Sequence, residues 1–159
     1  MGMVTTLKLD TSLPLQDAVD FMNTTYEQTK ALFLLYDRVA DTAQKQVIAD
    51  ECNLALKISL ALETNILFPA LAQISNRSIS SAAMMSQSVL TYLIDEIASL
   101  DTSSLVFDIK IKLLAAHLKD HIKVMRARVF RYLSGCDELN LYSLRTRMES
   151  FKNALIEQL

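Results

Sequence analysis

Apolar residues recur along this chain at steps of three and four, which is the spacing of one face of an α-helix. The repeat can be followed through five successive segments. Five amphipathic segments in one chain predict an all-α protein, because each helix can bury its apolar face only against the others. The five stripes are Leu15, Val19, Met22, Tyr26, Thr29, Phe33, Tyr36, Ala40; Ile48, Cys52, Leu56, Ser59, Glu63, Ile66, Ala70; Ile79, Ala83, Gln87, Leu90, Ile94, Ile97; Phe107, Ile111, Leu114, Leu118, His121, Met125, Val129, Tyr132; and Leu141, Leu144, Met148, Phe151, Leu155, Leu159.

The breaks between the stripes coincide with polar or glycine-containing stretches. Residues 76–78, 101–104 and 134–135 are of this kind, and 101–104 offers side chains that can cap the next helix. Ser12 and Pro14 together predict the start of the first helix, since serine caps helices and proline is tolerated in their first turn.

The composition supports a helical domain and indicates which partners and which cellular compartment to expect. The chain has 159 residues with only 2 Gly and 2 Pro, whereas sheet proteins need both at many turns. Its net charge of −2 predicts no general affinity for nucleic acid or anionic membranes, and no apolar run approaches the roughly 18 residues that span a bilayer. Cys52 and Cys136 form no CxxC pair, and the N-terminus has no basic segment before an apolar one, so we expect a cytoplasmic protein.

Polar residues on the apolar stripes are the candidates for function. Tyr26, Ser59, Glu63, Gln87 and His121 lie on four different stripes, and in a bundle such side chains can meet at one level. A buried carboxylate is costly unless it is paired, hydrogen-bonded or metal-bound, so Glu63 needs a partner such as His121 or Tyr26. A polar cluster satisfied without any ligand explains the same pattern.

The second segment carries a motif as well as a stripe. LETNILFPAL, residues 62–71, resembles the second-helix signature of the hemerythrin-like, HHE-type cation-binding family. That signature is a histidine, three residues, a glutamate, and then Leu-Phe-Pro. Glu63 stands six residues before Pro69, as in the family, and Ser59 occupies the histidine position.

The other segments resemble the same family by register. In the fourth, DHIKVM (residues 120–125) places His121 at the family histidine and Met125 at the glutamate, and Arg131 stands at the proline. In the first, Tyr26 occupies a histidine position. In the third, the expected histidine falls at Gln87 or Ser88.

The resemblance implies an up-down four-helix bundle over residues 14–133. Residues 1–13 would be an N-terminal extension, and residues 134–159 an additional C-terminal helix packed on the bundle or at an oligomer interface. The family uses about five histidines and two bridging carboxylates to hold two irons. Its members bind oxygen or handle nitric oxide, iron stress or metal sensing.

This chain lacks the ligands for such a centre. It has only 2 histidines, and Tyr26, Ser59, Gln87 and Met125 are poor substitutes for imidazole and carboxylate. We therefore expect no metal cofactor. A single iron or other divalent ion held by Glu63 and His121, with Tyr26 as a third ligand, is the alternative.

The functional expectation is a degenerate hemerythrin-like bundle that is not an enzyme and binds an unknown protein or small ligand. A Ser59–His121–Glu63 triad has no nucleophile turn beside it, and two glycines cannot form a phosphate loop. An interior lined by Met22, Met84, Met85 and Met125 could hold an apolar ligand. The remaining alternative is a structural homo-oligomer, such as a homodimer, built through the C-terminal helix, whose stripe is close to a heptad.

Overall fold

The computed structural model describes residues 16–74 and 78–159, and within these ranges every regular element is a helix. The prediction of an all-α protein is therefore confirmed. The elements are α1 (Ala18–Arg38), α2 (Thr42–Leu62), η2 (Glu63–Leu67), α3 (Phe68–Ala72), α4 (Ser78–Ala98), α5 (Leu105–Val124), η3 (Met125–Phe130), α6 (Arg131–Ser134) and α7 (Leu141–Glu157).

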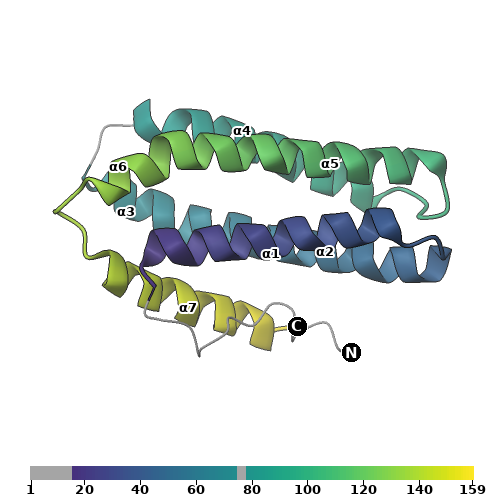
Figure 1. Ribbon diagram of the computed structural model, residues 1–159, viewed down its shortest axis with the longest axis horizontal. Helices are drawn as coiled ribbons and strands as arrows, with labels where there is room; N and C mark the ends of the chain where they lie inside the picture. Colours follow the sequence, from purple (N-terminus) through teal and green to yellow (C-terminus); the bar gives the residue numbers. More distant parts are fainter. Residues whose placement is uncertain (1–15, 75–77) are drawn as a thin grey trace.

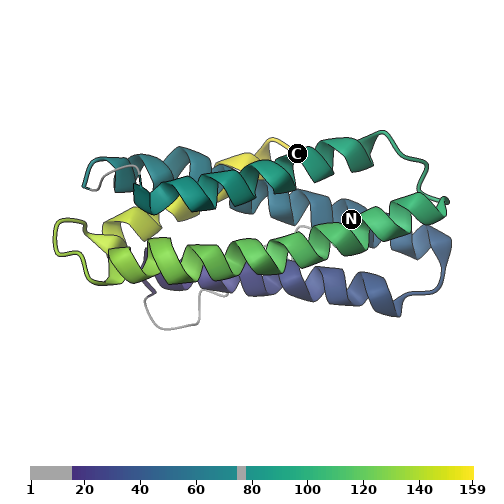
Figure 2. The same cartoon turned by 90° about the horizontal axis from the view of Figure 1, so that it is seen from above.

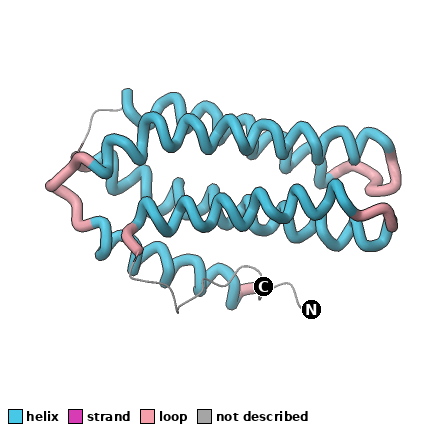
Figure 3. The backbone as a smooth tube through the Cα atoms, viewed as in Figure 1, coloured by secondary structure: helices cyan, strands magenta, loops and turns pink. Residues whose placement is uncertain are grey.

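Two antiparallel helix pairs make up the bundle (Figure 1). One pair is α1 with α2 and the other is α4 with α5, and the view from above shows the four helices running along a common axis (Figure 2). The connections within the pairs, residues 39–41 and 99–104, are short and lie at the same end of the molecule (Figure 3). Helix α7 lies against α1 and α2, on the side away from α4 and α5.

Polar side chains begin four of the helices. In each case the side chain accepts a hydrogen bond from a backbone amide three residues on, which satisfies one of the open donors of the first turn. Ser12 and Pro14 lie outside the described residues, and α1 begins at Ala18 behind a reciprocal pair of bonds between Asp17 and Asp20. The capping residues are Asp17, Asp41, Ser104 and Asn140.

Both long helices that carry the family-like motifs widen into a π turn. The π segment η2 begins at Glu63, and η3 begins at Met125, the corresponding position of the other motif. Pro69 accounts for the first, because it lacks an amide proton and its ring would clash with the carbonyl four residues earlier. Arg131 occupies the same place after η3, so the second π turn forms without a proline.

The predicted stripes form the core. All seven residues of the second stripe are buried, and so are seven of the eight on the fourth. Three buried hydroxyls, those of Thr25, Thr29 and Ser59, bond the carbonyl four residues earlier in their own helix. The continuous helix Thr42–Ala72 is long and apolar enough to cross a membrane, but 67% of its apolar window is buried inside the fold, as in the core helix of a soluble protein.

The apolar side of α7 packs inside the chain. Leu144 and Met148 are buried, and α7 contacts α1, α2 and η2. These side chains are therefore not free to pair with a second chain. Of the two positions expected for this helix, packed on the bundle or at an oligomer interface, its buried side takes the first.

Lys152 is buried in this contact, and the stripe pattern did not predict it. It is only 3% exposed, its Nζ has no hydrogen-bond partner, and it lies 5.6 Å from the centre of the Phe21 ring. Burial lowers the pKa of the Lys152 ammonium to about 8, and Glu149 on the same helix offsets only part of this effect. Docking α7 therefore costs free energy while Lys152 is charged.

We expect Lys152→Met to stabilise the protein at pH 7 by about 1–3 kcal/mol, since each unit of pKa shift corresponds to about 1.4 kcal/mol. Below pH 8 the lysine is protonated in both the folded and unfolded states. Between about pH 8 and 10.5 only the unfolded state keeps the proton, so the stability of the unmodified protein rises with pH. Urea unfolding across this range measures the effect.

The exposed Lys57→Met is the matched control, with an expected change within about 0.5 kcal/mol. A stability difference between the Lys152→Met variant and the unmodified protein that stays constant from pH 7 to 10.5 would contradict the depressed pKa.

Candidate functional site

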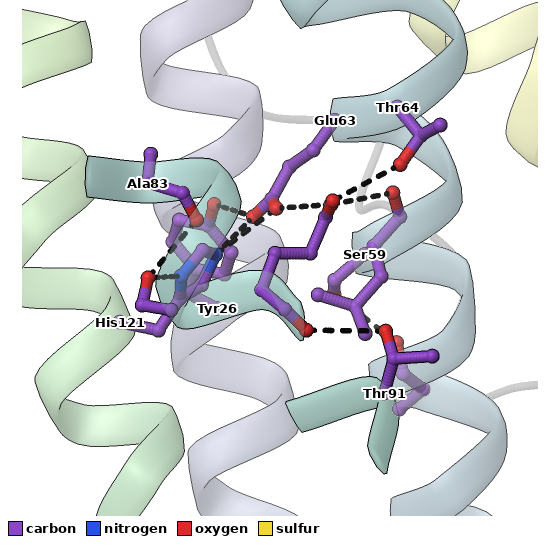
Figure 4. Close-up of polar contacts among 11 residues, drawn as sticks. Tyr26, Ser59, Glu63, Thr64, Ala83, Thr91 and His121 are labelled. Atoms are coloured by element: carbon purple, nitrogen blue, oxygen red, sulfur yellow. Dashed lines mark hydrogen bonds and ion pairs between the residues drawn. The ribbon is translucent and has the colours of Figure 1, made fainter. Parts of the chain in front are cut away.

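The carboxylate of Glu63 is the centre of a buried polar cluster (Figure 4). Glu63 stands at the first position of η2 and its side chain is fully buried. It accepts hydrogen bonds from the Tyr26 hydroxyl and from Gln87 Nε2, the latter at 3.0 Å. Nε2 of His121 lies 2.8 Å from one of its oxygens and 3.0 Å from the other.

His121 is held from both sides of its ring. An ionised carboxylate can only accept hydrogen bonds, so beside such a group Nε2 is the donor. On the other side Nδ1 contacts the hydroxyl of Ser86, which also reaches the carbonyl of Ala83 at 3.0 Å. The Ser86 hydroxyl therefore lies between Nδ1 and a backbone carbonyl and holds the ring on the side away from Glu63.

Tyr26 is a hydrogen-bond donor to Glu63. Burial raises the pKa of its hydroxyl well above the usual value, and the neighbouring Glu63 carboxylate raises it further. The phenol therefore stays protonated and holds its bond to Glu63. Phe130 of η3 stacks on the tyrosine ring with the ring centres 6.0 Å apart, which fixes the direction of the hydroxyl.

Gln87 separates the cluster from the surface. Its amide nitrogen bonds both Glu63 and the carbonyl of Leu60, and its oxygen lies 3.4 Å from the hydroxyl of Thr64. On the other side Gln87 and Thr64 line a groove of about 560 Å³ between α4 and the η2–α3 segment. The remaining lining residues are Phe68, Pro69, Ala72, Ser80, Ser81 and Met84.

The predicted site residues fall into two groups. Tyr26, Gln87 and His121 each bond Glu63, so these four side chains on different stripes do meet at one level. Ser59 is buried in the same region, but its hydroxyl bonds its own helix (Figure 4). Met125 is buried and apolar, so it offers no hydrogen bond to the cluster.

One prediction for α4 is wrong. Ser88, the alternative to Gln87, is exposed and bonds Met84 in its own helix, so it lies outside the cluster. Ser86 is the residue that reaches His121. Sequence reasoning missed it because Ser86 lies one position before the apolar stripe of its helix. A hydroxyl beside a predicted buried histidine is the signal that could have found it.

The donor chemistry does not fit a di-iron centre. Two irons need several imidazoles and two carboxylates, and this cluster offers one of each. Within the part of the chain that the structure describes, no three histidine, cysteine, aspartate or glutamate side chains come together in a way that could hold a metal. The Glu63 oxygens instead form hydrogen bonds with Tyr26, Gln87 and His121.

Comparison of the chain with protein-family models, with curated proteins and with solved structures returned no match.

Removing His121 should destabilise the protein far more than removing its neighbour. We expect His121→Ala to cost about 3–5 kcal/mol of unfolding free energy, because it leaves a buried carboxylate without its main partner. His117→Ala, one turn earlier and only partly buried, should cost about 0.5 kcal/mol or less. Urea denaturation of the two variants compares them directly, and equal losses would show that the buried pair contributes nothing particular.

Proposed function

We propose that this chain is a metal-free member of the hemerythrin-like group, an up-down four-helix bundle that acts as a cytoplasmic, non-enzymatic binding module. The observation that carries the proposal is the direct pairing of Glu63 with His121. The two strongest ligands at the family-like positions bond each other, so each occupies the direction in which the other would bind a metal.

The positions of the π turns support the relation to that group. Both begin at the residue where the family motif has its glutamate, Glu63 in one helix and Met125 in the other. Because π turns gather at functional sites, two of them in register are consistent with a bundle descended from one that held metal.

The enclosure of the cluster supports a binding role rather than catalysis. Glu63 and His121 are fully buried, and Gln87, which bonds Glu63, lies between them and the groove. The exposed apolar residues lie elsewhere, mainly on α4 and α5, which favours recognition of a partner at the surface.

A mononuclear site is the second candidate, and one observation favours it. Glu63 and His121 Nε2 face each other in the core, and a carboxylate oxygen and an imidazole nitrogen are both ligands of single divalent ions. The ion would replace the proton between them, with Tyr26 as the third ligand.

Metal content separates the two candidates. Protein expressed with added iron, manganese and zinc should contain less than about 0.1 equivalent of metal per chain, because one imidazole and one carboxylate hold such ions weakly. One equivalent that is lost in both Glu63→Ala and His121→Ala would establish the mononuclear site instead. Two equivalents would overturn the proposal.

Restoring ligands tests the relation to the family. If the register is right, the triple variant Y26H, S59H and M125E should bind at least about one divalent ion per chain, since it returns two imidazoles and a carboxylate around Glu63 and His121. The control is Y26H, S88H and M125E, which moves one imidazole to an exposed position. Equal metal contents in the two variants, with circular dichroism confirming that both fold, would contradict the assigned register.

A further inference from the structure

The outer face of α4 has a composition that water-facing helices rarely have. From Ser78 to Ile94 the helix contains no charged residue. Its exposed side nevertheless carries large side chains, with Met85 exposed by 73% and Tyr92 by 66%. Methionine and tyrosine are enriched, and charges depleted, at the centres of protein interfaces.

Helix α5 extends this face. Lys110 of α5 forms an ion pair with Glu96 of α4 at 2.8 Å, which places the turns next to these residues side by side. Within one turn of Lys110 lie Val106 and Leu113, and Ile109 is adjacent to it. We call seven of the exposed apolar side chains of this pair the α4–α5 face: Met84, Met85, Val89, Tyr92, Val106, Ile109 and Leu113.

The bundle does not cover the face itself. Helix α7 lies on the opposite side, against α1 and α2 (Figure 1). The seven side chains are each between 39% and 73% exposed, so a partner could cover a large apolar area here, and a standard interface takes ~800 Å² from each partner.

The charges at the two ends of α4 have opposite sign. Asp95 is exposed near the C-terminal end and has no ion pair within the described residues. Near the N-terminal end, Arg128 and Arg131 line the same surface depression as Ser78 and Ile79. Neither arginine has an ion pair among residues 16–74 and 78–159. An antiparallel copy of α4 would bring its acidic end to this basic corner.

We propose that the chain forms a homodimer in which the α4 helices of two copies pack antiparallel about a two-fold axis near Ser88. The small Ser88 allows the helices to approach at the axis. The symmetry then places Tyr92 of one copy, four residues after the axis, against Met84 of the other, four residues before it. Met84 lines the groove beside Gln87, so the tyrosine ring has an apolar recess to occupy.

A second copy suits the face better than an unrelated partner. In an isologous pair each contact occurs twice, so one face must be complementary to itself. The uncharged centre meets its own copy without repulsion, and the acidic end of each α4 helix lies beside the basic residues of the other copy. The inference goes beyond the proposed binding role and does not depend on metal content, so the two can fail separately.

Sedimentation velocity of the full chain tests the proposal. From about 1 to 100 µM the protein should sediment as a dimer, since interfaces of this size bind with micromolar or better affinity. Tyr92→Arg and Ser88→Arg should each weaken the dimer by at least about tenfold, because each places a charge in the apolar centre. Leu35→Arg on α1, at a side chain exposed by 45%, is the matched control and should leave it intact.

Charge exchange and cross-linking test the antiparallel arrangement. Asp95→Arg and Arg131→Glu should each weaken the dimer about threefold to tenfold, and the double variant should recover most of the loss. With Cys136→Ser in the background, Ser88→Cys should form a disulfide-linked dimer under mild oxidation, whereas Lys57→Cys on α2 should not.

Circular dichroism of each variant excludes loss of fold. A monomer at every concentration would overturn the proposal. A dimer that only Leu35→Arg disrupts would place the interface elsewhere. A dimer disrupted by Tyr92→Arg but neither rescued by the charge exchange nor linked through Ser88→Cys would overturn the antiparallel arrangement.

Discussion

The burial of the Glu63 carboxylate is the constraint on which the rest of the bundle depends. Each of the four long helices supplies one residue to the cluster. Tyr26 comes from α1, Gln87 from α4 and His121 from α5, and Glu63 itself ends α2. Apolar stripes can slide past one another by a turn at modest cost. A carboxylate that must receive three donors cannot, so this one group fixes the register of all four helices.

The sequence predicted the helices and most of this cluster for one physical reason. Residues repeated at steps of three and four share a helix face, so a polar side chain on a stripe must be buried with it. Tyr26, Glu63, Gln87 and His121 followed from that rule. The prediction that Met84 and Met85 line the interior is wrong, because both lie on the outer side of α4, at the surface. Lys152 was missed for the opposite reason, since its aliphatic stem can follow a core helix while the pattern records only its charge.

The cluster differs from a metal centre in what it requires of its surroundings. An ion binds several ligands at fixed lengths and tolerates their separation in sequence. A hydrogen bond joins only two groups, so stabilising a buried carboxylate without metal requires several donors, and each donor must be oriented separately. Phe130 orients Tyr26 by stacking on its ring, and Ser86 orients His121 by contacting Nδ1.

The buried charge of Lys152 has a consequence for how the molecule opens. Its free-energy cost falls entirely on the contact between α7 and the other helices, and it disappears as soon as α7 lifts away into water. The Glu63 cluster gains nothing from that movement, since it contains no residue of α7. We therefore expect α7 to separate before the four long helices, and amide hydrogen exchange along it to report this local opening.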